Sequence, residues 1–187
     1  VLEQETLENY SVYNKHTVHV GNSIVVHPYE ERKLHEDKIH FLYAGRLSAV
    51  KNVGPMIKAV KSYGRSCDFT ILGDGEERKQ LETLADGNER IHFAGAVSPD
   101  EVQETMKAAD MLVMNSTFEG IPIIILEAIS RGLPVITTDV GGIKEVLTYG
   151  KDSEVTDGSV ESIHSAMDKI VADYERYAKA AYEKSLQ

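Results

Sequence analysis

The sequence predicts an α/β fold built on a doubly wound, Rossmann-like parallel sheet. Five short apolar runs alternate with segments of helical periodicity between residues 39 and 147, and three of the runs end at a glycine. This alternation requires parallel strands with right-handed crossover helices on both faces of the sheet. Ligands of such sheets lie at the carboxyl ends of the strands, so we expect the functional residues in the loops that follow them.

Size and composition indicate one large domain with its own core. The chain has 187 residues, of which 42% are hydrophobic. Its 30 acidic residues exceed its 20 basic ones, and the net charge of −10 argues against a nucleic-acid partner. The single cysteine, Cys67, excludes an intramolecular disulfide, fits a reducing compartment and is expected to be buried. Apolar runs fall short of the ~18 residues of a transmembrane helix and no signal peptide is evident, so a soluble, cytoplasmic chain is expected.

The first 38 residues are expected to form a lead-in segment before the main domain. Residues 1–16 are polar with scattered apolar residues and suggest a short helix, and residues 17–20 suggest a peripheral strand. Residues 27–38 combine proline with charged residues and lack apolar periodicity, which predicts a surface loop.

The wound domain is expected to span residues 39–158, with a C-terminal helical segment at 159–187 that packs on it. The third helix has the clearest start signal, because Ser98 can cap it, Pro99 fits its first turn and Glu101 completes a capping box. The C-terminal segment has apolar residues at helical spacing and predicts one amphipathic helix or two in series. The predicted strand and helix pairs are 39–44 and 53–61, 69–72 and 76–85, 91–93 and a helix from 98, 111–114 and a helix from 122, and 135–138 and 144–147.

One apolar run, from Ile121 to Ile129, is interrupted only by Glu127. Pro122 suits the first turn of a helix, and Gly132 followed by Pro134 supplies its end. The run therefore predicts a helix of about ten residues that is apolar on all sides and hence buried.

Glu127 is expected to point toward the start of this helix. It follows Ile123 by four residues and Ile124 by three, so the three side chains share one face, and helical side chains lean toward the N-terminus. The first turn carries unpaired N–H groups and the positive end of the helix dipole, which together form a natural phosphate site. A second carboxylate, Glu119, lies just before the helix.

The two carboxylates are separated by seven residues in the order Glu-x7-Glu, with Gly-x-Pro directly after Glu119. This pattern resembles the C-terminal, donor-binding domain of GT-B fold retaining glycosyltransferases of family 4, the glycosyl transferases group 1. The resemblance runs from residue 39 to about 150 and continues through Gly132-x-Pro134-Val135-Ile136 and Gly141-Gly142-x-x-Glu145. The chain departs from the family at Ile121, where Phe is usual, and at Asn115 before Ser116, where Pro is common, and both departures bear on the sugar pocket.

The resemblance implies a role for each matching residue. Glu119 would bond hydroxyls of the transferred sugar, and Glu127 would hold the ribose of the nucleotide. Arg46 and Lys51 match the family's GR-L-x-x-x-K loop, which holds the donor diphosphate, and Val97 is an expected base contact. Taken alone, these two cations in a glycine-containing βα loop could grip a phosphate or could be solvated surface charges. The implied substrate-binding residues are Gly45, Arg46, Lys51, Val97, Glu119, Gly120, Ile121, Pro122, Ile123 and Glu127.

Other motifs are weaker. Gly73-Asp74-Gly75 follows a strand, but Arg78 stands where a dinucleotide fingerprint needs its third glycine, so a tight turn is predicted. The seven histidines show no metal-ligand spacing, and no nucleophile elbow is present. We expect no metal and no cofactor.

The predicted function is donor binding in retaining sugar transfer from a nucleotide-diphosphate sugar. Arg46, Lys51 and the first-turn amides would stabilise the leaving diphosphate, and Glu119 would orient the sugar, with no residue assigned as nucleophile. The acceptor would be bound by an N-terminal domain outside this chain, which could also place the protein peripherally at a membrane. Alternatives are a sugar-nucleotide epimerase of the same fold and a non-catalytic nucleotide-binding module.

Overall fold

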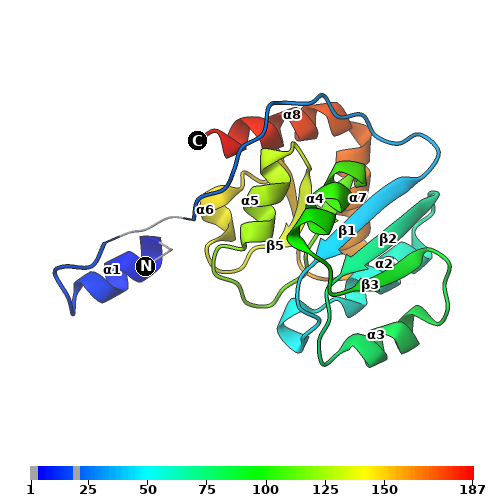
Figure 1. Ribbon diagram of the computed structural model, residues 1–187, viewed down its shortest axis with the longest axis horizontal. Helices are drawn as coiled ribbons and strands as arrows, with labels where there is room; N and C mark the ends of the chain where they lie inside the picture. The colour runs from blue at the N-terminus through cyan, green and yellow to red at the C-terminus, as the bar shows by residue number, and fades with distance from the viewer. Residues whose placement is uncertain (1–3, 19–21) are drawn as a thin grey trace.

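The computed structural model describes residues 4–18 and 22–187. In this part of the chain a parallel sheet of six strands has the order β3-β2-β1-β4-β5-β6, with helices around it (Figure 1). The doubly wound parallel sheet predicted from the sequence is confirmed. The strands are β1 (Ile39–Ala44), β2 (Cys67–Leu72), β3 (Ile91–Gly95), β4 (Met111–Val113), β5 (Val135–Thr138) and β6 (Ser153–Thr156). The helices are α1 (Gln4–Ser11), α2 (Gly54–Ser62), α3 (Arg78–Ala85), α4 (Pro99–Ala108), α5 (Ile123–Ser130), α6 (Ile143–Val146), α7 (Val160–Ala172) and α8 (Tyr174–Ser185), with a short 3-10 turn at Ala49–Lys51.

The sheet separates two hydrophobic cores. Successive β1 residues alternate between them: Phe41 and Tyr43 pack with α2, α3 and α7, whereas Leu42 packs with α4, α5 and α6. This alternation follows from the two-residue period of a strand covered by helices on both faces. Helix α8 contributes Tyr177 to the first core and Ala181 to the second, so it packs against both cores.

The C-terminal segment forms two helices in series, α7 and α8, as one of the two expected arrangements. The capping box of α4 is also confirmed, because Ser98 Oγ accepts from the Glu101 N–H while the Glu101 carboxylate accepts from the Ser98 N–H. Cys67 is buried, as expected. Among the described residues, none of the helices combines the length and the apolar character needed to cross a bilayer.

Strand β6 is not predicted by the sequence analysis. Its one apolar residue, Val155, is exposed, and Glu154 is buried where the apolar pattern of a strand would require a hydrophobic side chain. The Glu154 carboxylate is compensated by Lys169 Nζ at 2.9 Å and by the hydroxyl of Tyr177. Because both partners come from α7 and α8, the strand depends on contacts that its own sequence does not reveal.

The predicted strand at residues 17–20 falls partly outside the described residues. Thr17 and Val18 adopt no strand conformation, and residues 19 and 20 are not described. The expected helix in the same region is present as α1. A peripheral strand is thus absent from the described residues of the lead-in segment.

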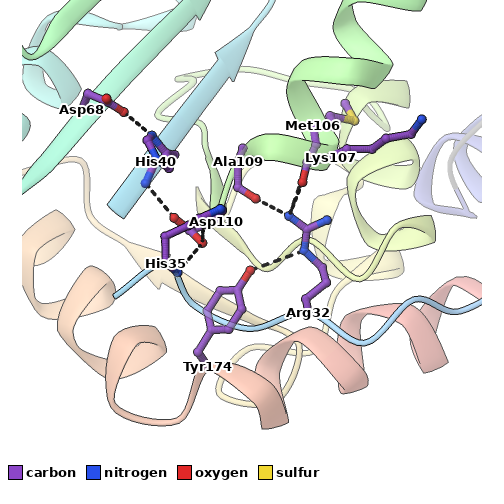
Figure 2. A network of polar contacts seen from close by, with 9 residues as sticks. All are labelled: Arg32, His35, His40, Asp68, Met106, Lys107, Ala109, Asp110 and Tyr174. Atoms are coloured by element: carbon purple, nitrogen blue, oxygen red, sulfur yellow. Dashed lines mark hydrogen bonds and ion pairs between the residues drawn. The ribbon is translucent and has the colours of Figure 1, made fainter. Parts of the chain in front are cut away.

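Residues 22–38, hereafter the strap, form an irregular segment that passes α8 and leads into β1 (Figure 1). The predicted loop over residues 27–38 is confirmed. Hydrogen bonds and a ring contact hold the strap against the domain at several positions. The Tyr182 hydroxyl donates to the carbonyl of His27 (2.9 Å), and the rings of Tyr29 and Tyr182 lie 4.8 Å apart. Arg32 directs its guanidinium at the carbonyls that end α4, those of Met106 and Lys107 at 3.3 Å and that of Ala109 (Figure 2).

The strap ends at a buried carboxylate beside the amino ends of β1, β2 and β4. Asp110 accepts from the N–H of His40 at 2.7 Å and lies 2.8 Å from Nδ1 of His35. His40 Nδ1 in turn lies 2.6 Å from Asp68 Oδ1 (Figure 2). These contacts lie at the amino ends of the strands, whereas the loops expected to bind ligand follow the carboxyl ends. They therefore stabilise the fold without occupying the predicted ligand site.

Candidate functional site

The predicted site residues gather at the carboxyl edge of the sheet, between β1 and β4. These strands are neighbours in space, and the strand order runs outward from them in both directions. The loops after them are joined by a hydrogen bond from the Thr117 N–H to the Val50 carbonyl (2.8 Å). Such a switch point leaves a crevice in which doubly wound folds bind ligands.

Lys51 and Glu119 are in direct contact across this crevice. Lys51 Nζ lies 2.6 Å from Glu119 Oε1, and the Ser116 hydroxyl donates to the same oxygen at 2.6 Å. The Glu119 side chain is only 8% exposed, and Lys51 is partly buried. From the sequence, the two residues are expected to contact different parts of a ligand, and in the structure they contact each other.

Arg46 is placed differently, because its guanidinium is 74% exposed. It forms a long ion pair with Glu76 Oε2 (3.3 Å), while its backbone carbonyl accepts a hydrogen bond from the buried Tyr43 hydroxyl (2.8 Å). Burial, assisted by the charge of Glu119, raises the pKa of Tyr43 well above its ordinary value, so this hydroxyl remains a donor. The Tyr43 hydrogen bond therefore fixes the loop backbone, while the exposed Arg46 guanidinium can exchange Glu76 for a ligand.

The Gly73-Asp74-Gly75 motif packs against the backbone of this loop. A Cβ at Gly73 would lie 1.9 Å from the carbonyl oxygen of Gly45, and Gly73 has a φ of +129°. The Leu47 N–H also donates to the Asp74 carbonyl at 2.9 Å. The motif leads into a tight turn at Glu76 and Glu77, which the Arg78 N–H closes on the Gly75 carbonyl at 3.1 Å, and its glycines allow two backbones to approach closely.

A second close approach fixes the loop that carries Glu119. A Cβ at Gly141, where φ is +56°, would lie 1.7 Å from the carbonyl oxygen of Glu119. The Gly142 N–H donates to the Gly120 carbonyl at 3.2 Å. The Gly141-Gly142 pair noted in the sequence thus acts on the position of Glu119.

Helix α5 begins after Pro122 and is shorter than predicted, with eight residues. Its end is as expected: Gly132 has a φ of +65°, and the N–H groups of Gly132 and Leu133 bond back to Ile129 and Ala128 in a Schellman motif. The expectation of burial on all sides is wrong, since Ile123 is 54% exposed. The helix packs on the sheet and on α8 with one side, and its other side faces open cavities.

Glu127 projects from this open side and is half-buried. In the described part of the chain its carboxylate makes no hydrogen bond or ion pair. Burial raises its pKa, and nearby Arg131 opposes this rise. A carboxylate in this state has unused acceptor capacity for ligand hydroxyls.

A cavity of about 300 Å³ beside Glu127 brings together residues from three predicted loops. Gly45, Val97 and Glu127 all line it, although they follow different strands. The remaining lining residues are Ala44, Pro99, Val102, Gln103 and Ile124. The expected base contact Val97 and the expected ribose contact Glu127 therefore border one space together with Gly45, whereas Arg46 and Lys51 are not among its lining residues.

A polar cluster next to this cavity was not predicted from the sequence. Arg131 donates through Nε to Gln103 Oε1 (2.6 Å), and its Nη2 lies 3.0 Å from Nε2 of His27 in the strap. Arg131 follows Glu127 by one helical turn, a spacing that could have signalled their proximity. The cluster joins the strap, α4 and α5 at the rim of the site.

The contacts of Asn115 account for one departure from the family pattern, in which proline is common at this position. Its buried Nδ2 donates to the carbonyls of Asn52 (3.3 Å) and Gly158 (3.4 Å), bonds that a proline could not make. Asn52 directly follows Lys51 and adopts a left-handed conformation with φ of +47°. Asn115 therefore holds the end of the loop that carries Lys51. Its Oδ1 is buried without a partner among the described residues.

The described residues include no group of three His, Cys, Asp or Glu side chains arranged to hold a metal ion. His35 and His40 are engaged with aspartates at the opposite edge of the sheet (Figure 2).

Comparison with known proteins identifies a family. The family model for glycosyl transferases group 1 matches residues 29–185. The chain is 31% identical over 121 residues to the alpha-D-kanosaminyltransferase of Streptomyces kanamyceticus, a match that covers 62% of this chain and 31% of that protein. This chain thus spans about a third of the relative's length.

Solved structures share the fold at lower sequence identity. The apo form of the lipopolysaccharide outer core galactosyltransferase WaaB aligns with a TM-score of 0.82 at 21% identity, over 98% of this chain and 56% of that one. HepE from Anabaena, in complex with UDP and glucose, aligns with a TM-score of 0.71 at 22% identity, over 80% of this chain and 43% of that one. Both likenesses agree with the Rossmann-like half of a GT-B fold. Because the family model covers well over half of the described residues, the chain belongs to the glycosyl transferases group 1 family.

Proposed function

We propose that this chain is the donor-binding domain of a glycosyltransferase that takes its sugar from a nucleotide-diphosphate sugar and transfers it with retention at the anomeric carbon. The contact between Lys51 Nζ and Glu119 Oε1, at 2.6 Å, carries the proposal. It sets a cation suited to phosphate beside a carboxylate suited to sugar hydroxyls at the switch point of the sheet. HepE, which has a similar fold, was solved with UDP and glucose, which supports a ligand of this class.

The ligand is proposed to extend along the carboxyl edge of the sheet. Its base and ribose occupy the cavity lined by Val97 and Glu127, and its diphosphate lies near Gly45 and Lys51. The transferred sugar then reaches Glu119. Residues Gly120 to Ile123 present the loop and the first-turn N–H groups of α5 to the phosphates.

The chemical contribution of this domain is electrostatic. As the bond between sugar and diphosphate breaks, negative charge develops on the diphosphate, and Arg46, Lys51 and the first turn of α5 stabilise it. We assign this neutralisation to protein groups and not to a metal ion. Glu119 orients the sugar and is not assigned as a nucleophile.

The acceptor is proposed to bind outside this chain, because the relatives extend well beyond the matched segment. The isolated chain should therefore bind donor but transfer no sugar, since positioning of both reactants requires both sides of the site. A sugar-nucleotide epimerase would instead act on the donor alone, and a non-catalytic module would bind nucleotide without any role for Glu119.

Titration calorimetry with UDP, GDP and ADP and their glucose or mannose derivatives tests the proposal. At least one nucleoside diphosphate should bind, and Glu119→Ala should weaken the sugar derivative while sparing the diphosphate. Glu89→Ala, which removes an exposed carboxylate in the turn after α3, is a matched control for charge. The proposal fails if no nucleotide binds, or if Glu119→Ala weakens both ligands equally.

A further inference from the structure

Ser116 is the third member of the Lys51–Glu119 contact and has no assigned role. It lies in the loop after β4, three residues beyond Val113, and is 1% exposed. Its hydroxyl donates to Glu119 Oε1 at 2.6 Å, the same oxygen that Lys51 contacts. Its backbone carbonyl accepts from the Thr138 hydroxyl at 2.6 Å, which ties Ser116 to the end of β5.

The two oxygens of Glu119 are therefore unequal. Oε1 accepts two hydrogen bonds, whereas Oε2 accepts none in the described part of the chain and is not sealed from solvent. Two donors on one oxygen fix the rotation of the carboxylate and leave Oε2 as the acceptor open to a ligand.

The two donors also differ in freedom. Lys51 is a long side chain with 24% exposure, and a diphosphate would compete with Glu119 for its ammonium group. Ser116 is short and buried, so its hydroxyl can leave Glu119 only by rotation about one side-chain bond within packed surroundings. When Lys51 turns to the phosphates, Ser116 is the donor that remains on Oε1.

We propose that Ser116 is a positioning residue that holds Glu119 toward the transferred sugar when the diphosphate engages Lys51, an inference that rests on the proposed function. Loss of this hydroxyl would leave the liganded carboxylate free to rotate. The effect would appear in recognition of the sugar and not of the diphosphate.

Ser153 offers a matched control. It is also fully buried, and its hydroxyl also donates to a carboxylate, Asp152 Oδ1 at 2.8 Å, on β6 away from the site. Ser116→Ala and Ser153→Ala thus remove the same kind of bond from similar surroundings. Ser116→Thr keeps a hydroxyl at the site and serves as the conservative variant.

The experiment measures calorimetric affinities for three pairs, UDP and UDP-glucose, GDP and GDP-mannose, and ADP and ADP-glucose, and uses the pair that the unaltered chain binds most tightly. Ser116→Ala should lower the affinity for the nucleotide sugar by about tenfold, the effect of one hydrogen bond to a charged group, and change that for the diphosphate by less than about twofold. Ser116→Thr should retain most of the sugar preference. Thermal unfolding of each variant checks that the fold persists.

The outcomes separate the two proposals. If the unaltered chain binds neither diphosphate nor nucleotide sugar, the proposed function is wrong. If it binds both and Ser116→Ala keeps the ratio of the two affinities, the role of Ser116 is wrong. An equal change of that ratio in Ser153→Ala would also overturn it, because the effect would then be one of general stability.

Discussion

Lys51 and Glu119 neutralise each other across the crevice between β1 and β4, with Nζ 2.6 Å from Oε1. Each charge is largely withdrawn from water, so neither could remain there alone without a free-energy cost. Under the proposed function, a donor ligand would supply both replacements at once, a phosphate for Lys51 and sugar hydroxyls for Glu119. Binding of the two halves of the ligand would then be coupled through this pair.

The two cations of the first loop should respond differently to salt. Lys51→Ala and Arg46→Ala should each weaken a nucleoside diphosphate and its sugar derivative by similar amounts, about 1.5–3 kcal/mol for Lys51. Arg46 is 74% exposed, so its contribution should shrink more as salt is raised. Calorimetry at about 0.05 M and 0.5 M salt measures both effects, spanning short and long screening lengths. A salt-independent loss in Arg46→Ala would mean that its guanidinium buries itself against the ligand.

Removal of the Glu127 carboxylate should weaken nucleotide binding without loss of stability. Glu127→Ala should reduce affinity for the nucleoside diphosphate by about 1.5–3 kcal/mol, the value of a hydrogen bond to a charged group. The carboxylate makes no hydrogen bond or ion pair among the described residues, so unfolding by denaturant should show no loss in its absence. Unchanged affinity would refute the ribose assignment. A large drop in stability would show that the carboxylate has a structural role.

The same residue should give the free chain a pH-dependent stability. Burial raises the folded-state pKa of Glu127 above its ordinary value of 4.5. The folded chain binds this proton more tightly than the unfolded chain does. The resulting stabilisation is complete below pH 4.5 and is lost as the pH rises through the folded-state pKa of Glu127. Relative to the parent, Glu127→Gln should gain free energy of unfolding between about pH 4 and pH 7, measured by denaturant titration at each pH. A difference between the two proteins that does not vary with pH would contradict this.

Gly141 and Gly87 form a matched pair for testing the loop that carries Glu119. Both have positive φ, +56° and +64°, but a Cβ at Gly141 would strike the Glu119 carbonyl, whereas one at Gly87 would meet open space. Gly87→Ala should cost about 1 kcal/mol of stability from backbone strain alone. Gly141→Ala should cost more and should also weaken nucleotide-sugar binding, as read by denaturant unfolding and calorimetry. Equal effects of the two substitutions would show that the loops separate freely.

The buried Asp110 should govern stability and leave the ligand site unaffected. Asp110→Asn loses one acceptor oxygen from a site that receives the His40 N–H and the ring of His35, and should destabilise the fold by about 1–3 kcal/mol. Asp37→Asn, at an exposed position in the strap, is the control. Because Asp110 lies at the opposite edge of the sheet, nucleotide affinity of the folded variant should be unchanged. A change in that affinity would indicate coupling across the sheet.

The elements whose sequences carry their own signals were predictable. Strand β1 has the predicted bounds, because every residue from 39 to 44 is apolar or fits a strand buried on both faces. The end of α5 at Gly132 and the capping box at Ser98 and Glu101 were also evident, since both depend on a few neighbouring residues. The strand at β6 was not, because its buried Glu154 is acceptable only once Lys169 and Tyr177 are in place.

The same distinction between local sequence signals and tertiary contacts applies to the candidate site. The spacing of Glu119 and Glu127 could be read directly from the chain, and the parallel sheet implied that their loops would meet the loop of Lys51. The direct contact between Lys51 and Glu119 could not be predicted, because it depends on side-chain positions set by Ser116 and by Gly141. The exposure of Ile123 depends in the same way on which side of α5 its neighbours cover.

The neighbouring positions of β1 and β4 divide the site between two halves of the chain. Lys51 and Glu119 are 68 residues apart in sequence, and the turn after α3, at residues 86–89, lies between them on the surface. A chain cut in that turn would give one fragment with Arg46 and Lys51, the proposed phosphate-binding cations, and another with Glu119 and Glu127. Neither fragment could build the crevice alone, and pairing of β1 with β4 and of β2 with β3 would restore it. A split version of this domain could therefore report the meeting of two tethered proteins through the recovery of the proposed nucleotide binding.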